Sequence, residues 1–299
     1  MTTVLSFGAT GNFGRDVPRH LRAVGADLRL RLASSSSEGV AQLRAHHPDA
    51  EVVHADLLDP SSLRRAVAGV HKVFVVTPDF MDEETAMGNL VAAARDAGTV
   101  RHLLRLLFVL PGVAYADIPP DLRAMHMPQA QHMDARAVLD ASGLPVTYLN
   151  VLSWSMRNFI WMTGAMIRDT HRIAIPGERS VPYIDPQDVA EVAARILATD
   201  APAQVGECLD LTGAERLSFS EVARVFSEVL GFAVEYADDP EPLRRRFGPR
   251  ARVLLDFLRW EHPYADRFPL TDAVERLLGR PPRTLRQWLV DNADAFRAG

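Results

Sequence analysis

The sequence predicts an α/β protein, with a doubly wound parallel sheet followed by a smaller, partly helical C-terminal domain. Three observations lead to this fold class. Short apolar runs alternate with segments of helical period up to about residue 150, as expected for repeated βα units. Three glycines, Gly8, Gly11 and Gly14, directly follow the first apolar run. After residue 150 the alternation gives way to shorter strands and proline-punctuated helices.

The first domain is expected to span residues 1–152. A continuous apolar strand such as 72–78 is typical of a sheet covered on both faces. The predicted strands are 3–8, 27–33, 51–57, 72–78, 101–110 and 145–152. The predicted helices run from the glycines to about residue 25 and over 38–47, 60–69, 83–98 and 122–143.

The second domain is expected to span residues 153–299 and to bind substrate. It contains two short strands within 172–184, a helix over 186–199 that opens at Asp185, and a strand within 206–213. A helix with a capping box from Ser218 to Glu221 follows, then a strand at 233–237. The strand at 181–184 and the helix at 186–199 could return to the first domain. From Asp238 onward the chain is expected to form a small helical cap over the carboxyl edge of the sheet.

Composition limits the function classes. The chain has 299 residues, 47% hydrophobic and 24% charged, which suits a globular protein of one or two domains. Its net charge of -5 argues against broad contact with nucleic acid or an anionic membrane. We find no signal peptide or long apolar run. The only cysteine, Cys208, excludes an internal disulfide, favours a cytoplasmic location, and is expected to be inert.

The segment from Gly8 to Gly14 fits a dinucleotide-binding loop because it follows a strand and opens a helix. Gly8 permits the tight turn, Gly11 lets the backbone approach a pyrophosphate, and Gly14 lets the helix pack close to the sheet. The helix N-terminus then attracts the phosphates. The predicted cofactor contacts here are Gly8, Thr10, Gly11, Asn12, Phe13 and Gly14.

The end of the second strand favours NADP, although NAD stays open. An acid about 20 residues past the glycines would bind the ribose of NAD, and none occurs before Glu38. Arg31, together with Ser34, Ser35 and Ser36, could donate to a 2′-phosphate. Asp56 and Leu57 could contact the adenine side, or could form a plain strand-to-helix turn. Thr77 and Pro78, after the fourth strand, are further predicted cofactor contacts.

Several segments together resemble the NmrA-like family of atypical short-chain dehydrogenases. The resemblance covers nearly the whole chain and implies a Rossmann domain with NAD(P) in a crevice beside a smaller C-terminal domain. It also implies either reduction of small carbonyl or quinone substrates or a cofactor-sensing role. The segments are GATGNFGR, HADLLDPSSL, VFVVTP, ASGLPVTYL, MRNF, VPYIDPQDVAEVAARIL, LTGAERLSFSEVA and GRPPRTLRQWLVDNADAF.

The usual Ser-Tyr-Lys proton relay of the wider superfamily is absent. The only lysine is Lys72, and Ala68 stands four residues before it. Alignment of the long helix places His132 where the lysine would be and Pro128 where the tyrosine would be. His132 is therefore the candidate proton donor, or alternatively a cofactor-ribose or packing residue. Its possible neighbours are Tyr115, His126, Gln129 and Asn150, of which Asn150 is also a predicted cofactor contact.

The segment 152–167 is rich in large apolar side chains and is expected to form a helix over the cofactor. Its apolar residues would line a substrate pocket with Tyr115, or would simply pack in the core. The predicted liners are Trp154, Met156, Phe159 and Trp161. The arginines at 244–246, 250 and 252 could meet an anionic substrate or form a solvated surface. No metal site is expected, because His126 and His132 do not share a helix face.

The function that this sequence favours is NADPH-dependent reduction of a small apolar carbonyl, enone or quinone. A non-catalytic sensor of the nicotinamide pool is the alternative from a different class, motivated by the missing proton relay. A non-redox isomerase or cyclase that reuses the pocket is a further alternative. A homodimer or a regulatory protein partner is also compatible with the sequence.

Overall fold

The structure is a computed structural model that describes residues 1–25, 27–200 and 203–297. The chain divides into two compact units. Unit 1 comprises Met1–Val151 and Val189–Asp210, and unit 2 comprises Leu152–Asp188 and Leu211–Gly299. The chain therefore passes from one unit to the other three times, and the last two passages enclose the returning segment 189–210.

Unit 1 is built on a seven-stranded sheet in the order β10-β6-β5-β4-β1-β2-β3. The pairs β1–β2, β2–β3, β1–β4, β4–β5 and β5–β6 are parallel, with Val4 opposite both Leu30 and Lys72. The order reverses direction between β1 and β4, so the predicted doubly wound fold is confirmed. The strands are β1 Thr2–Phe7, β2 Leu28–Ser34, β3 Glu51–His54, β4 Lys72–Val75, β5 His102–Leu107, β6 Val146–Val151 and β10 Cys208–Leu211.

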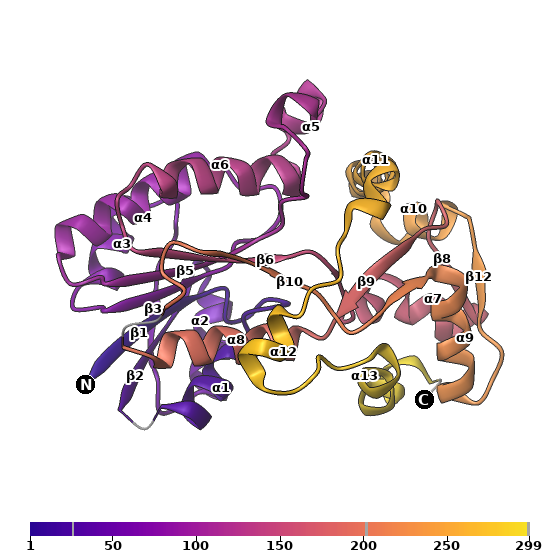
Figure 1. The fold of residues 1–299 in the computed structure, drawn as a ribbon, viewed down its shortest axis with the longest axis horizontal. Coiled ribbons are helices and arrows are strands. Elements are labelled where there is room, and N and C mark those ends of the chain that lie inside the picture. Colours follow the sequence, from indigo (N-terminus) through magenta and orange to yellow (C-terminus); the bar gives the residue numbers. More distant parts are fainter. Residues whose placement is uncertain (26, 201–202, 298–299) are drawn as a thin grey trace. The chain divides into compact units, whose positions relative to one another are not determined.

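Helices cover both faces of this sheet (Figure 1). One face packs against α3, α4 and α6 through a buried apolar cluster that includes Leu63, Met87 and Leu139. On the other face Leu32 of the sheet packs with Leu43 of α2. The helices of the doubly wound region are α1 Val17–Val24, α2 Ser37–His46, α3 Pro60–Val67, α4 Glu83–Ala97, α5 Pro120–Ala124, α6 Pro128–Asp140 and α8 Pro186–Ala198.

Two predicted helices differ from the structure at prolines. The first helix begins at Val17 rather than directly after Gly14, because Pro18 is tolerated only in a first turn. The long helix predicted over 122–143 is broken into α5 and α6. Pro128 opens α6, and His126 in the break has a φ of +50°. A proline inside a helical pattern ends the preceding helix, which explains the break.

Unit 2 contains two small sheets and several helices. One sheet has the order β11-β9-β7 and the other pairs β12 with β8 in parallel. The capping box of Ser218 and Glu221 at the start of α9 is present as predicted. The strands are β7 Trp154–Ser155, β8 Arg172–Ala174, β9 Ser180–Ile184, β11 Arg216–Ser218 and β12 Glu235–Ala237. The helices are α7 Gly164–Thr170, α9 Phe219–Leu230, α10 Glu241–Phe247, α11 Ala251–Glu261, α12 Ala273–Leu278 and α13 Leu285–Asn292.

The prediction of one helix over 152–167 is wrong. The segment begins with the short strand β7, continues through a π-helical turn at Phe159–Thr163, and only then enters α7. Strand β7 pairs with β9, with Trp154 opposite Tyr183 and Ser155 opposite Ile184. This pairing with a strand about 30 residues away decides the local structure, and helical periodicity alone could not reveal it.

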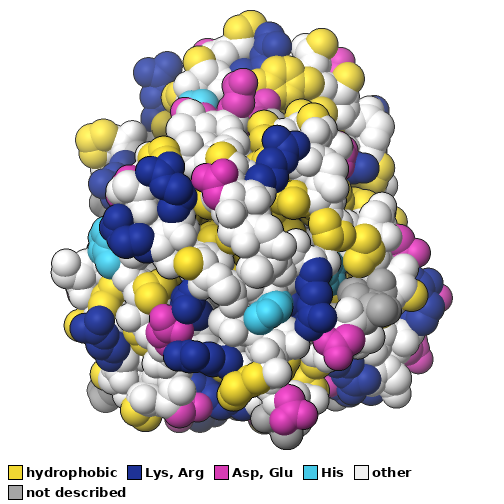
Figure 2. All heavy atoms as spheres, turned by 90° about the vertical axis from the view of Figure 1, so that its left-hand side faces the viewer, with side chains coloured by type: hydrophobic (Ala, Val, Ile, Leu, Met, Phe, Trp, Pro, Cys, Tyr) yellow, Lys and Arg dark blue, Asp and Glu magenta, His cyan; other side chains and the backbone are white. Residues whose placement is uncertain are grey.

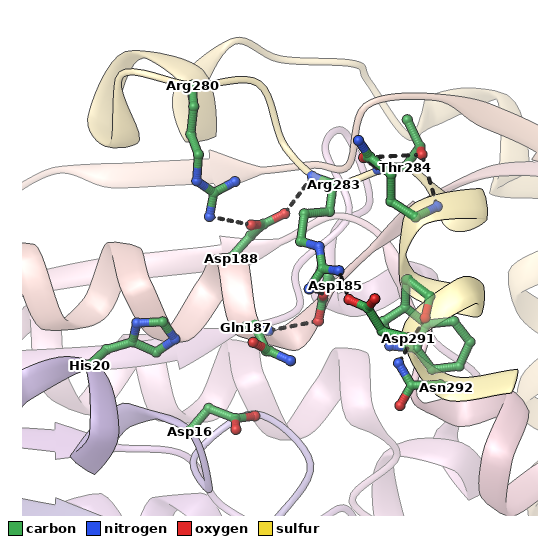
Figure 3. Close-up of polar contacts among 12 residues, drawn as sticks. Asp16, His20, Asp185, Gln187, Asp188, Arg280, Arg283, Thr284, Asp291 and Asn292 are labelled. Carbon is green, nitrogen blue, oxygen red and sulfur yellow. Dashed lines mark hydrogen bonds and ion pairs between the residues drawn. The ribbon is translucent and has the colours of Figure 1, made fainter. Parts of the chain in front are cut away.

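Buried carboxylates tie the C-terminal segment to the turn that opens α8 (Figure 3). Asp188 is fully buried and accepts hydrogen bonds from Arg280 Nη2 and from the Arg283 backbone N–H, each at 2.8 Å. The Arg283 guanidinium lies 3.1 Å from Asp185 Oδ2 and also bonds Asp291. These contacts anchor the chain between α12 and α13 within unit 2.

The surface mixes charges of both signs. Figure 2 shows one face on which arginine and lysine side chains lie among acidic and apolar ones rather than in one field. Within the part of the chain that the structure describes, no helix is long and apolar enough to cross a membrane.

The single lysine has a structural place in unit 1. Lys72 opens β4 and is fully buried. Its ammonium donates to the carbonyls of Leu197 and Thr199, at 2.7 and 2.8 Å, and lies 3.6 Å from Asp200. Burial lowers its pKa, and Asp200 opposes that effect. Lys72 therefore caps the C-terminus of α8, where a cation also suits the helix dipole.

We expect Lys72→Met to lower the free energy of unfolding by about 1–3 kcal/mol, because two buried carbonyls lose a charged donor. Arg101→Gln is the matched control, since Arg101 pairs with the same Asp200 but is exposed. Arg101→Gln should lower the free energy of unfolding by less than about 1 kcal/mol. Urea unfolding of both variants gives the comparison. Equal losses would show that Lys72 does not cap α8.

Candidate functional site

The candidate site lies at the carboxyl ends of β1 and β4, where the strand order of unit 1 reverses. Gly8 follows β1 with a φ of +78°, and its carbonyl accepts the Gly11 N–H at 2.9 Å. A Cβ at Gly8 would stand 2.4 Å from Val76 Cγ1 and 2.6 Å from Val76 O. A Cβ at Gly14 would stand 2.2 Å from Gly8 O. Gly8 and Gly14 are thus required for the loop to fold onto β4.

The charge of this loop suits a phosphate. From Gly8 to Gly14 it contains no carboxylate. Arg15 follows, and its Nε donates to Gly11 O at 3.3 Å, which holds a guanidinium against the loop. Thr10, Asn12 and Phe13 are partly exposed here. A glycine turn before a helix at the switch point is the arrangement that binds a diphosphate in doubly wound folds, and Arg15 adds a cation beside it.

The structure does not support Arg31 as a donor to a 2′-phosphate. Its guanidinium donates to the carbonyls of Ala66 and Ala68, at 2.7 and 2.8 Å, and lies 3.0 Å from Glu51. The Arg31 side chain is therefore already bonded at the end of α3 and the start of β3. We correct the prediction that it donates to a 2′-phosphate. Arg31 lies three residues before the end of β2, and its side chain is used within the fold.

The serines at and just after the end of β2 stay predicted donors to a 2′-phosphate. Ser36 Oγ caps α2 by accepting the Gly39 N–H at 3.0 Å. Ser34 Oγ accepts the Ser36 N–H at 3.3 Å. The Ser35 side chain is exposed, while its carbonyl is held by His54 at 3.0 Å. Each hydroxyl still has a proton to donate.

The chain after β3 forms a tight turn. Asp56 Oδ1 accepts the Leu58 N–H at 2.9 Å, and the Asp56 N–H donates to Ser62 Oγ at 3.0 Å. Leu57 is buried, and its carbonyl accepts from Asn89 at 3.0 Å. These hydrogen bonds fix the geometry of the turn. The contact of Asp56 and Leu57 with an adenine stays a prediction.

A buried ionic network supports the loop after β4. Arg105 of β5 and Glu83 of α4 are both fully buried, with Arg105 Nη2 at 2.6 Å from Glu83 Oε1. The same nitrogen donates to Thr77 Oγ1 at 2.8 Å, and the Thr77 hydroxyl donates to Glu83. Gln131 of α6 donates to Pro78 O at 2.8 Å and to Glu83 at 3.2 Å. Thr77 and Pro78 are therefore held in place from two helices and a strand.

Sequence reasoning missed this network, although a signal for it exists. Arg105 interrupts the apolar run of β5, and a guanidinium in a strand covered on both faces needs a buried acidic partner. Glu83 supplies that partner from the first turn of α4. The sequence shows an acid there but not that it points inward, because helix first turns commonly carry exposed acids.

Three side chains hold the backbone that follows β5. The Phe108 N–H donates to His132 Nδ1 at 2.7 Å, the Val109 N–H to Asn150 Oδ1 at 2.8 Å, and the Leu110 N–H to Gln129 Oε1 at 2.9 Å. Asn150 also donates to Val109 O at 3.0 Å and to Asp210 at 2.8 Å. Asn150 is thus engaged within unit 1, where it positions this loop, and its contact with a cofactor stays a prediction.

His132 is held as a neutral acceptor. Its Nδ1 receives the Phe108 N–H, which leaves Nε2 to carry the ring proton. Burial and the nearby Arg105 guanidinium lower the pKa of His132 to about 3. A ring that stays neutral near pH 7 does not serve as an imidazolium acid. We therefore correct the prediction that His132 donates the proton, and the structure gives it a positioning role.

Tyr115 lies in a short 3₁₀ turn and is partly exposed, at 37%. Its hydroxyl is 3.5 Å from Asp134 of α6, and Arg123 stacks over its ring at 5.4 Å. Burial and Asp134 raise the pKa of Tyr115, so the hydroxyl stays protonated. His126 lies in the break before α6. The sequence did not predict that its backbone is left-handed.

The predicted apolar wall packs mainly inside unit 2. Trp154, Met156 and Phe159 are buried. Trp154 lies 5.3 Å from Phe219, and Phe159 lies 5.5 Å from Tyr183, between ring centroids. These three side chains therefore take the core-packing role that the sequence left open beside a substrate wall. Trp161 differs, since it is 43% exposed and contacts Phe247 at 5.6 Å.

The predicted arginine cluster is spread over paired, stacked and exposed side chains. Arg244 pairs with Glu241 at 2.6 Å, Arg246 stacks over Phe247, and Arg252 lies 3.7 Å from Asp256. Arg245 and Arg250 are exposed. Burial raises the pKa of the Cys208 thiol, as expected for an inert cysteine in a strand.

The sheet order and the glycine loop at its switch point define a doubly wound α/β protein of the dinucleotide-binding class. A sequence profile described as the NmrA-like family matches residues 1–258, and the chain belongs to this family.

Two relatives and one solved structure illustrate the similarity. The (4-alkanoyl-5-oxo-2,5-dihydrofuran-3-yl)methyl phosphate reductase of Streptomyces griseus is 29% identical, over 98% of this chain and 99% of its own. The NAD(P)H azoreductase of Xenophilus azovorans is 28% identical, over 99% of both chains. The structure of an NADPH-dependent quinone oxidoreductase from Escherichia coli, complexed with NADPH, has a TM-score of 0.77. It is 21% identical and covers 97% of this chain and 99% of its own, a likeness of fold.

The state of His132 predicts how stability depends on pH. Between about pH 3 and 6.5 the folded protein keeps this ring neutral while the unfolded chain protonates it, so acidification favours unfolding. Between pH 6.5 and about pH 5, the titration of His132 should lower the free energy of unfolding by about 2 kcal/mol. His132→Asn keeps an acceptor for the Phe108 N–H. Over the same pH range, urea titrations should show that its free energy of unfolding falls by about 2 kcal/mol less than that of the wild type. The control His46→Asn, on the exposed end of α2, should follow the wild type. A wild-type slope in His132→Asn would contradict the buried neutral state.

Proposed function

We propose that this protein is an NADPH-dependent oxidoreductase that reduces a small apolar carbonyl, enone or quinone without a Ser-Tyr-Lys set. The observation that carries the proposal is the glycine turn at the switch point, closed on Val76 and flanked by Arg15. Membership of the NmrA-like family and relatives named as reductases over nearly the whole chain support it. The identity of the acceptor is the more specific part of this proposal.

The cofactor would be held by residues that follow four strands of unit 1. Gly8, Gly11 and Gly14 accommodate the diphosphate, with the Arg15 guanidinium close by. Beyond β2, the run from Ser34 to Ser37 offers hydroxyls and no carboxylate, which suits a 2′-phosphate. Asp56 and Leu57 would lie on the adenine side. Thr77 and Pro78, fixed by the Arg105 network, would lie along the middle of the cofactor.

The protein's own groups would position the reactants rather than donate a proton through a side-chain relay. The nicotinamide supplies the hydride when bound. His132 fixes the backbone after β5 through Phe108 and keeps Nε2–H as a donor for the cofactor or acceptor. The acceptor gains one hydride and one proton, and we propose that the proton comes from water. Tyr115 remains a candidate donor of a hydrogen bond because its hydroxyl stays protonated.

Calorimetry followed by turnover tests this function. We expect NADPH to bind more tightly than NADH, and absorbance to show NADPH consumption with quinones or enones. Gly11→Asp, which puts a carboxylate where the diphosphate would lie, should remove both signals. Tight binding without turnover of any acceptor would contradict the reductase and favour the sensor. Activity that survives in cofactor-free Gly11→Asp protein would favour the isomerase or cyclase.

The serine run predicts cofactor preference. Ser35→Glu places a carboxylate on the exposed residue after β2, and the affinity for NADPH should fall about tenfold or more through repulsion of the 2′-phosphate. NADH, which lacks that phosphate, should lose little. The control Gln42→Glu adds the same charge on an exposed position of α2 and should change neither affinity more than about twofold. Equal losses for both cofactors in Ser35→Glu would place the 2′-phosphate elsewhere.

A further inference from the structure

Phe80, in the loop between β4 and α4, is both strained and exposed. Its φ is +66°, in the left-handed region that a bulky side chain rarely adopts. Its side chain is 45% exposed. A strained backbone persists only where the surroundings determine it, and such residues concentrate at ligand sites. Packing of the Phe80 side chain therefore does not explain its strained backbone.

The conformation of Phe80 is imposed by the buried network beneath it. The Phe80 N–H donates to Gln131 Oε1 at 2.7 Å. Gln131 is fully buried and uses its amide nitrogen on Pro78 O and Glu83. Glu83 is in turn paired with Arg105. A chain of buried hydrogen bonds from β5 and α6 thus ends at the backbone of one exposed phenylalanine.

A second exposed aromatic ring is tied to the same side of α6. The Tyr115 hydroxyl contacts Asp134, which lies three residues after Gln131 on that helix. Positions three apart on a helix are neighbours on one side. The Phe80 backbone and the Tyr115 hydroxyl therefore meet α6 within one turn of each other, beside the carboxyl ends of β4 and β5.

The surroundings of these two rings are acidic. Glu84 is exposed in the first turn of α4, four residues after Phe80. Asp82 caps α4 by accepting the Thr85 N–H at 3.1 Å. The guanidinium that contacts this group is Arg123, which stacks on Tyr115. Asp82 and Glu84 follow Phe80 within four residues, and Asp134 lies at the Tyr115 hydroxyl, so carboxylates accompany both rings.

We propose that Phe80 and Tyr115 form the ring-binding part of the acceptor site, and that its acidic rim selects neutral or cationic planar aromatic acceptors over anionic ones. The proposal rests on the proposed reductase function and deepens it by naming the substrate class. Aromatic rings bind a planar acceptor by stacking or edge contacts. A sulfonate or phosphate on that acceptor meets Glu84 and Asp134 at short range and is repelled. Phe80 thereby sets specificity, while Gln131 acts on the acceptor only through Phe80.

Equilibrium binding to the NADP⁺-saturated protein tests the ring site without turnover. The probe is neutral 2-(hydroxymethyl)anthraquinone, followed by calorimetry. Phe80→Gly removes the ring and relieves the strain, so the melting temperature should hold or rise while the dissociation constant rises about three- to tenfold. Val24→Ala, which trims an equally exposed apolar side chain at the far end of α1, should leave the dissociation constant unchanged. Unchanged binding in Phe80→Gly would overturn the proposal.

A charged probe tests the rim. Anthraquinone-2-sulfonate should bind the wild type at least about threefold more weakly than the neutral probe. Glu84→Gln should narrow that ratio, whereas Glu275→Gln, the corresponding first-turn change in α12 of unit 2, should not. Equal or tighter binding of the sulfonate by the wild type would overturn the charge selection.

The outcomes for the ring site and for the reductase are distinguishable. If the protein binds the neutral probe through Phe80 but never consumes NADPH with it, the reductase fails and the aromatic site stands. If NADPH is consumed by quinones with the same KM in the wild type and in Phe80→Gly, the reductase stands and the aromatic site fails. A wild type that binds no anthraquinone overturns the site directly.

Discussion

The buried pair of Arg105 and Glu83 is the interaction on which the arrangement of the candidate site depends. Both charges are fully removed from water, and such a pair contributes little net stability even with good geometry. Its consequence is positional, because Thr77, Pro78 and Gln131 all take their places from it. The same guanidinium helps to keep His132 neutral. One ion pair in the middle of a parallel sheet therefore fixes the loops after β4 and β5 and the protonation state of the nearest histidine.

The residues that could have carried acid–base chemistry serve instead to hold backbone. His132, Asn150 and Gln129 accept hydrogen bonds from three successive N–H groups after β5, in a segment that leaves the sheet and has no ladder partner there. Lys72 caps α8 on the amino side of the sheet. Under the function proposed above, chemistry at this edge would depend on what a bound cofactor brings and on water, because these side chains hold backbone.

Sequence reasoning succeeded where local rules decide the structure. The strand order follows from alternating βα units, the turn at Gly8 from glycine spacing, and the start of α9 from the Ser218–Glu221 box. It failed where distant partners decide. Arg31 is captured by α3 and Glu51, and Trp154 enters a strand paired with β9. Arg105 was overlooked because its partner lies 22 residues away in the first turn of a helix, where acids are commonly exposed. Side-chain direction in a tertiary environment is the information that a sequence pattern lacks.

The C-terminal segments that carry the family resemblance have a structural explanation. VPYIDPQDVAEVAARIL contains Asp185 and Asp188, and GRPPRTLRQWLVDNADAF contains Arg280 and Arg283, which bind those carboxylates within unit 2. Removing either arginine side chain would leave a buried carboxylate without its guanidinium partner, which destabilises the fold. The loop that presents Phe80 is under a different constraint, since its backbone is fixed from below while its side chain remains open to solvent. A change of the Phe80 side chain is then expected to alter what binds without disturbing the ionic framework that supports it.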